Sequence, residues 1–232
     1  MGIYTYDLSY FIFMIPCLLL SLYCSAKVNS TFRKYSQIPN RRGLTGAQAA
    51  QQVLSANGVT GVRIEPVSGN LTDHFDPRTN VIRLSDSVYN STSVAAVGVA
   101  AHEAGHAVQH AQGYVPNKLR SAIVPVANFG SRLSWILIFI GCLLPTEFNI
   151  CITLGIIFFS FSVLFTLITL PVEFNASSRA LATIKAHNLL YDEEYGGAKK
   201  TLSAAAMTYV AAAATSVAQL LRLLLILYRR RD

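Results

Sequence analysis

Two histidines and a glutamate near the middle of the chain have the spacing of a metal site. His102, Glu103 and His106 form an H-E-x-x-H pattern inside an apolar run that is typical of a helix. Residues four apart lie on one face of a helix, so both imidazoles can reach one metal ion, and Glu103 lies beside it. The pattern predicts a zinc peptidase centre, in which the histidines hold Zn²⁺ and the glutamate accepts a proton from the activated water.

A catalytic zinc site needs a third protein ligand. His110 continues the four-residue spacing, but it lies about 12 Å along the helix axis from His102, too far for two bonds of about 2 Å to one ion. Glu173 is the better candidate, because it follows an apolar hairpin that returns the chain to the side of the metal helix, and it would complete a His₂Glu set. From the residues alone, a carboxylate that favours a helix N-terminus explains Glu173 equally well.

Much of the rest of the chain is predicted to form membrane helices. Of the 232 residues, 52% are hydrophobic and 13% are charged, against about 25% charged in a typical soluble domain. Residues 8–26 and 150–170 carry no charge, and residues 123–144 are interrupted only by Arg132. The first run covers nearly the thickness of the hydrocarbon core, and the other two are long enough to cross it. The sequence therefore predicts a mainly α membrane protein, which excludes an ordinary soluble domain.

The formal charge of +7 at pH 7 could suggest a nucleic-acid binder. The basic residues are scattered, however, and many flank the apolar runs. This distribution favours contact with anionic lipid headgroups over nucleic acid. The four cysteines lie in or beside apolar runs and form no C-x-x-C pair, so a cysteine zinc site is not supported.

Short elements around the metal helix predict a small α+β, zincin-like domain. Thr45 is predicted to cap a helix that Gly58 ends. Ser91 or Ser93 is predicted to cap the metal helix, and Gly113 to end it. Residues 62–67, which Pro66 limits to a sheet edge, and residues 80–85 are predicted strands. We expect these two strands to pair as a short β-hairpin or sheet beside the metal helix, where an edge strand can take the substrate backbone.

The order of the elements predicts five segments. A helix is expected from Pro171 to about Asn188, a loop at residues 192–197, and a last apolar helix at residues 203–228. The segments are an N-terminal transmembrane anchor (1–26), a catalytic domain with the H-E-x-x-H helix (27–120) and a transmembrane helical hairpin (121–171). A third-ligand helix and loop of the catalytic domain (172–202) and a C-terminal apolar helix with a basic tail (203–232) follow.

Four separated motifs together carry a family resemblance. They are L-T-D-H-F-D-P at residues 71–77, A-A-H-E-A-G-H-A-V-Q-H at 100–110, P-V-E-F-N-A-S at 171–177 and A-A-A-M-T-Y-V-A at 204–211. In this order they resemble the YugP-type family of bacterial membrane zinc metallopeptidases, over nearly the whole chain. The resemblance implies a membrane-embedded zinc endopeptidase.

The arrangement is similar, more distantly, to the membrane gluzincins that include HtpX and the CAAX-prenyl proteases. Their third ligand lies in an E-x-x-A-D pattern, which Glu173 and Ala176 match. The resemblance thus implies Glu173 as the third zinc ligand. Ser177 stands where those proteins have aspartate, and this departure affects the hydrogen bond to the ligands rather than the ligand itself.

The expected reaction is hydrolysis of a peptide bond in a peptide or protein substrate. Zn²⁺ activates the water and polarises the carbonyl, and Glu103 is the general base that passes the proton to the leaving amine. A donor for the oxyanion is also needed. His74, Arg179 and Tyr209 are available, and nothing in their spacing selects one of them.

Other functions remain open. A non-catalytic membrane scaffold with a structural zinc site would need a fourth ligand, such as His74 or His110. An intramembrane site-two-type protease would place the motif inside a full span, but the uncharged run at residues 94–101 is too short for that. The same zinc chemistry could also process a lipid or a signal molecule.

Two groups of basic residues indicate on which side of the membrane the metal helix lies. The positive-inside rule places the metal helix in the cytoplasm, because basic residues flank the spans on its side. These residues are Lys27, Arg33, Lys34, Arg41, Arg42, Lys118, Arg120, Lys199 and Lys200. The basic tail at residues 229–231 also favours the cytoplasm, and both cues hold only if the last helix does not fully cross. We expect a multi-pass protein of the bacterial plasma membrane with a cytoplasmic catalytic domain.

Overall fold

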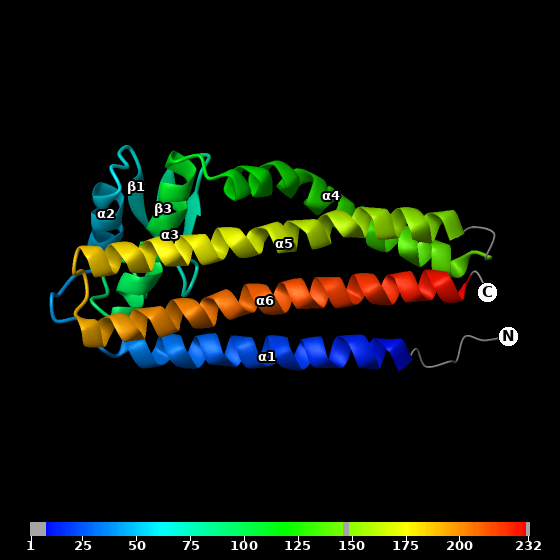
Figure 1. The fold of residues 1–232 in the computed structure, drawn as a ribbon, viewed down its shortest axis with the longest axis horizontal. Coiled ribbons are helices and arrows are strands. Elements are labelled where there is room, and N and C mark those ends of the chain that lie inside the picture. Colours follow the sequence, from blue (N-terminus) through cyan, green and yellow to red (C-terminus); the bar gives the residue numbers. More distant parts are fainter. Residues whose placement is uncertain (1–7, 146–148, 231–232) are drawn as a thin grey trace. The chain divides into compact units, whose positions relative to one another are not determined.

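The computed structural model describes residues 8–145 and 149–230. Within these residues the chain is mainly helical with one small sheet, which confirms the predicted fold class (Figure 1). The elements in chain order are α1 (Leu8–Ser36), α2 (Gly46–Ala56), β1 (Arg63–Val67), β2 (His74–Asp76), β3 (Val81–Ser85), α3 (Val94–Ala111), α4 (Val115–Leu143), α5 (Asn149–Ala186) and α6 (Asp192–Arg229).

The chain divides into two compact units, and the first consists of apolar helices. It comprises the described residues of Met1–Tyr23, Leu119–Leu170 and Thr208–Asp232. Among the described helices, α1, α4, α5 and α6 are each long and apolar enough to cross a membrane. Side chains of α4, α5 and α6 form an apolar cluster of Ile138, Ile152, Ile156, Phe159, Val163, Leu223 and Leu227.

All four long helices extend beyond the predicted runs: α1 continues to Ser36 and α4 begins at Val115. The differences in α5 and α6 concern the predicted ligand helix and loop. α5 is one continuous helix of 38 residues that passes through Pro171, where the sequence predicted a new helix to begin. Glu173 therefore lies far from a helix N-terminus, and the dipole explanation for this carboxylate is wrong. α6 begins at Asp192, in the predicted loop. Its first turn contains three acidic side chains, and negative charge is favourable at that end of a helix.

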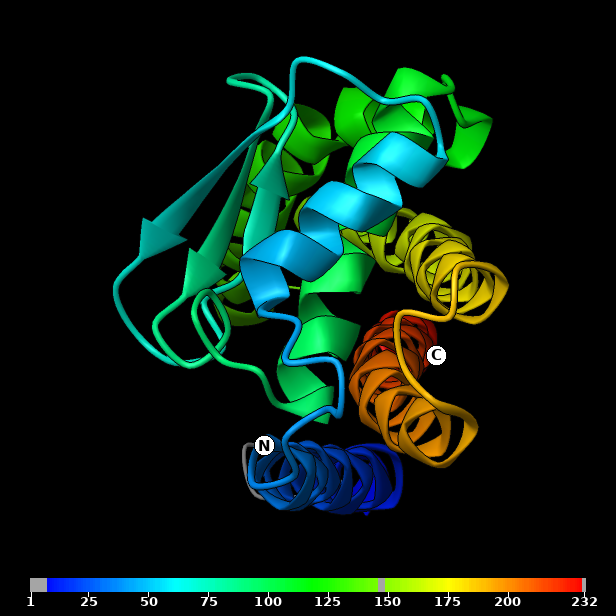
Figure 2. The same ribbon diagram turned by 90° about the vertical axis from the view of Figure 1, so that its left-hand side faces the viewer.

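The second unit comprises Cys24–Lys118 and Pro171–Met207. Its core is the contact between α2 and α3, and both helices border the sheet (Figure 2). Their facing side chains are mostly alanine and valine, which allow close packing of the two backbones. Thr45 caps α2 in a reciprocal pair with Gln48, and Ser93 caps α3. Both predicted N-termini are thereby confirmed.

The sheet has the strand order β1-β3-β2. β1 is parallel to β3, so the predicted hairpin between these two strands is wrong. The hairpin partner of β3 is β2, which runs antiparallel to it. The intervening turn explains this pairing: Asp76 accepts hydrogen bonds from Arg78 N at 3.0 Å and Thr79 Oγ1 at 2.8 Å, and Asn80 has a φ of 55°. Pro66 lies in β1 at the sheet edge, as predicted.

Candidate metal centre

Three side chains from two helices converge in the second unit. The Glu173 Oε2 atom of α5 lies 3.3 Å from His102 Nε2 and 3.4 Å from His106 Nε2, both on α3. The ligand atoms of the three residues all lie within 4.8 Å of one another. Tetrahedral Zn²⁺ with bonds of 2.0–2.1 Å separates its ligand atoms by about 3.3 Å. The two imidazoles and the carboxylate therefore fit a zinc ion in both chemistry and spacing.

The approach of α5 to α3 depends on a residue inside the motif. A Cβ atom added to Gly105 would lie 2.6 Å from the carbonyl oxygen of Ala176, closer than real Cβ contacts. Any larger residue at this position would push the two backbones apart. Gly105 stands directly before His106, and Ala176 is one turn after Glu173, so this contact sets the distance between the ligands.

Each histidine ring is held by a hydrogen bond on the nitrogen that faces away from Glu173. His102 Nδ1 lies 3.0 Å from Ser177 Oγ, and His106 Nδ1 lies 3.1 Å from Gln109 Oε1. When each Nδ1–H donates, each Nε2 presents its lone pair toward the carboxylate, as metal binding requires. Ser177, the position at which the sequence departs from the expected aspartate, thus retains a hydrogen bond to a ligand ring.

Gln109 is the residue of this site that sequence reasoning missed. It is fully buried, and its Nε2 donates to Val172 O at 2.8 Å and to Asn175 Oδ1 at 3.0 Å, both on α5. These two acceptors orient the amide, so Oε1 faces His106. The available signal was position: Gln109 lies three residues after His106, on the same helix face.

The site is nearly closed to solvent and carries negative charge. The Glu173 side chain is 3% exposed, and both imidazoles are 14% exposed. Burial favours a lower pKa for His106, but the hydrogen bond to Glu173 and the charges of Glu103 and Glu173 raise this pKa above its usual value. The surroundings therefore favour positive charge at the ring, as a cation site would.

The other histidines considered as ligands lie elsewhere. Within the described residues, the group that could hold a metal contains neither His74 nor His110. His74 is exposed on β2, with its Nδ1 2.8 Å from Thr72 O. The His110 ring lies 5.8 Å from the ring of Phe75, between centroids.

The oxyanion candidates also differ in their surroundings. Arg179 donates from Nε to Asn175 Oδ1 at 2.7 Å and from its guanidinium to Gln112, so it belongs to the hydrogen bonds that join α5 to α3. Tyr209 lies in the other unit. The role of either residue stays a prediction.

The comparisons with known proteins agree with this geometry. Residues 10–228 match the model of a family described as "Putative neutral zinc metallopeptidase". The chain belongs to this family. It is also 49% identical to the "Putative membrane protease YugP" of Bacillus subtilis over 223 residues, which cover 96% of this chain and 98% of that protein. No solved structure matches the chain. The family resemblance is confirmed, and the cofactor of this zinc peptidase family is Zn²⁺.

Proposed function

We propose that the chain is a multi-pass membrane endopeptidase in which His102, His106 and Glu173 hold Zn²⁺ and Glu103 is the general base. The observation that carries this proposal is the spacing of the three ligand atoms, two of whose separations are 3.3 and 3.4 Å. Those separations are close to the value of about 3.3 Å for a tetrahedral zinc site. Family membership supports the same reaction class.

Each residue of the proposed site has a separate role in peptide hydrolysis. Zn²⁺ bound at this site supplies a Lewis acid that acidifies a water and polarises the scissile carbonyl. Glu103 is mostly buried on α3, and its charge acts on the neighbouring His106 ring. Its carboxylate accepts the proton of the attacking water and passes it to the leaving amine. Ser177 and Gln109 hold the two imidazole rings in one orientation during these transfers.

An extended peptide is the substrate that the fold can align. β2 is an edge strand and lies against α3. Its free edge can pair with a substrate backbone and lay the peptide along the H-E-x-x-H helix. His74 is exposed on this strand and remains a candidate donor to the oxyanion.

A structural zinc site is the main alternative, and the ligand number argues against it. Closed structural sites use four protein ligands, whereas catalytic sites use three and keep one position for water. In the described part of the chain, the group that could hold a metal has three members. The proposed catalytic portion combines residues 27–120 with residues 172–202.

Elemental analysis tests the metal ligands directly. Wild type is expected to contain one zinc per chain, and Glu173→Ala to lose most of it. The matched control is Glu193→Ala, which removes a carboxylate that is 80% exposed and pairs with Arg41. Full zinc in Glu173→Ala would remove this residue from the site. Absence of zinc in the reconstituted wild type would overturn the proposal.

A second variant separates metal binding from catalysis. Glu103→Gln keeps the size of the side chain but cannot accept the proton, so zinc content should stay at the wild-type level. Peptide hydrolysis should fall by at least about 100-fold, the usual contribution of a positioned acid–base group. Cleavage at the wild-type rate would contradict the assignment of the base.

We further propose that the catalytic portion faces the cytoplasm. The basic residues that flank the spans on its side support this orientation. The tail is a weaker cue than its composition suggests, because Arg230 donates to the carbonyl oxygens of Gly141 at 2.6 Å and Leu144 at 2.8 Å. This side chain therefore caps the end of α4. Arg231 lies outside the described residues. Reporter fusions after Asp232 and near Gln48 test the orientation.

A further inference from the structure

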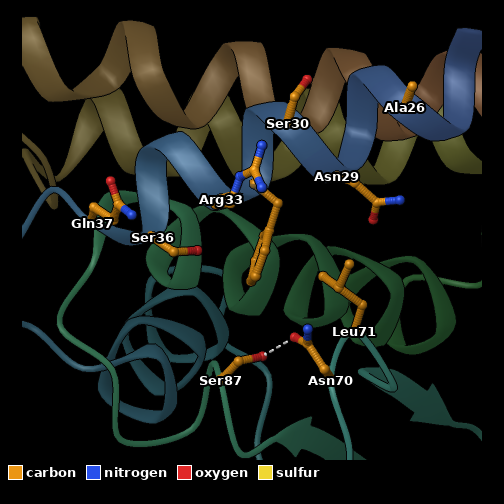
Figure 3. A pocket seen from close by; sticks show the side chains of 10 residues that line it. Ala26, Asn29, Ser30, Arg33, Ser36, Gln37, Asn70, Leu71 and Ser87 are labelled. Atoms are coloured by element: carbon orange, nitrogen blue, oxygen red, sulfur yellow. Dashed lines mark hydrogen bonds between the residues drawn. The ribbon is translucent and has the colours of Figure 1, made fainter.

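A cavity of about 560 Å³ lies in the second unit, away from the residues of the metal centre. One wall is the last part of α1, and the other is formed by the loop before β2 and by Ser87 (Figure 3). Cavities of this size hold small molecules in other proteins. The lining of the cavity defines the chemistry of a matching occupant.

The lining carries one positive charge and no acidic residue. Arg33 provides the charge, and no ion pair or hydrogen bond joins its guanidinium to another described residue. Ser36 Oγ is buried with no hydrogen-bond partner among the described residues. These two groups lie on neighbouring turns of α1 and face one cavity. A ligand with several acceptor oxygens and a negative charge would satisfy both.

The opposite wall adds further donors and an apolar surface. Asn70 Oδ1 accepts from Ser87 Oγ at 2.7 Å, so its amide nitrogen remains a donor (Figure 3). Leu71 lies beside it with a φ of 56°, a conformation that costs energy for a residue other than glycine. Its side chain is 38% exposed and gives the cavity an apolar side. The occupant therefore combines an oxyanion with an apolar part.

The place of the cavity along α1 indicates the source of such a molecule. Its lining begins at Ala26, where the uncharged run of α1 ends, and includes Arg33, seven residues further. Seven residues correspond to about 10 Å of helix, and helical side chains point back toward the N-terminus. The guanidinium thus reaches the depth of lipid phosphates, which lie about 5–8 Å outside the hydrocarbon core.

We propose that this cavity binds the phosphate headgroup of an anionic phospholipid. Arg33 pairs with the phosphate, Ser36 and Asn70 donate to its oxygens or to the headgroup, and Leu71 packs against the glycerol and the first part of the acyl chain. The site is independent of the proposed peptidase chemistry, so it can be tested without a protease assay.

The experiment uses the full chain in bilayer discs of phosphatidylcholine with a minor share of phosphatidylglycerol. Native mass spectrometry then counts the lipids that the released protein retains. Wild type should retain phosphatidylglycerol in preference to phosphatidylcholine. Arg33→Gln should reduce this retention about tenfold, through loss of one charge-assisted contact. The variant should fold, because Arg33 has no described partner to lose.

The matched control is Lys34→Gln, on the next position of α1. It removes the same charge, but Lys34 does not line the cavity and lies over the ring of Tyr35. Equal losses in both variants would indicate general attraction of the basic surface to the membrane and would overturn the proposal. Unchanged retention in Arg33→Gln would also overturn it. Displacement of the lipid by inorganic phosphate would identify free phosphate as the ligand instead.

Discussion

Replacing Gln109 tests whether its amide positions a zinc ligand. The side chain makes three hydrogen bonds: one accepted from His106 and two donated to Val172 O and Asn175 Oδ1. Gln109→Met keeps nearly the same volume and removes all three. Because Asn175 Oδ1 still accepts from Arg179, the group left without a partner is the buried Nδ1–H of His106.

The size of the effect follows from these contacts. Three neutral hydrogen bonds contribute roughly 2–4 kcal/mol in total, so the metal-free protein should unfold at a clearly lower temperature. Loss of a hydrogen bond to a ligating histidine typically weakens metal binding about 10- to 100-fold, which is roughly 1.4–2.8 kcal/mol. Zinc affinity, measured by competition with a chelating dye, should therefore fall by that factor.

Gln109→Glu tests the accepting oxygen of the amide separately from its donating nitrogen. Its carboxylate still accepts from His106 Nδ1–H, so zinc affinity should remain near wild type. It cannot donate to Val172 O or Asn175 Oδ1, so the metal-free protein should still be destabilised. The matched control is Gln52→Met, which removes an exposed amide on α2.

One pattern of results would refute the reasoning. If Gln109→Met bound zinc as tightly as wild type, the hydrogen bond to His106 would have no role in metal binding. If Gln109→Glu lost zinc as strongly as Gln109→Met, the effect would come from the contact with α5 rather than from the ring. Gln52→Met should leave zinc affinity unchanged in either case, which excludes a general effect of replacing a glutamine by methionine.

Three other residues offer separate tests. Ser177→Ala should weaken zinc binding about tenfold by removing the hydrogen bond to His102, and Ser177→Asp should restore it. Gly105→Ala should lower stability by about 1–3 kcal/mol in thermal unfolding, because its Cβ would lie 2.6 Å from an α5 carbonyl. The hydrogen bond from Thr79 is the main cause that lowers the pKa of Asp76 from the ordinary 3.8 to about 2. The ionised carboxylate should therefore stabilise the folded protein above about pH 4, and this stabilisation should be lost as the pH falls toward 2.

Each of these predictions has its own contradicting result. Normal zinc affinity in Ser177→Ala would show that the hydrogen bond to the His102 ring is not needed for zinc binding. Gly98→Ala is the control for Gly105, since its Cβ would lie an ordinary 3.4 Å from Ala198 Cβ, and equal destabilisation of the two would exclude the close-approach argument. For Asp76, the difference in unfolding temperature between wild type and Asp76→Asn should vanish in acid. A difference that grew as the pH fell would contradict a lowered pKa for this carboxyl.

The sequence by itself determined the features that depend on neighbouring residues. The helical repeat places His102 and His106 on one face before any tertiary contact is known. Thr45, and either Ser91 or Ser93, were predicted to begin helices because each can supply a local acceptor to the backbone, and the structure has the caps at Thr45 and Ser93. The class of the protein follows equally from composition, since long uncharged runs cannot remain exposed to water.

Only the tertiary structure decided what joins distant parts of the chain. No rule of spacing relates Glu173 to His102, which lies 71 residues earlier; the meeting of their side chains depends on the close contact of α3 with α5 at Gly105. The pairing of β1 with β3 was likewise predicted with the wrong direction, because strand patterns show which residues are buried but not which strands are neighbours. Gln109 was missed for the same reason. Its acceptors lie on another helix, and a glutamine in an apolar run has no evident partner until the two helices are packed together.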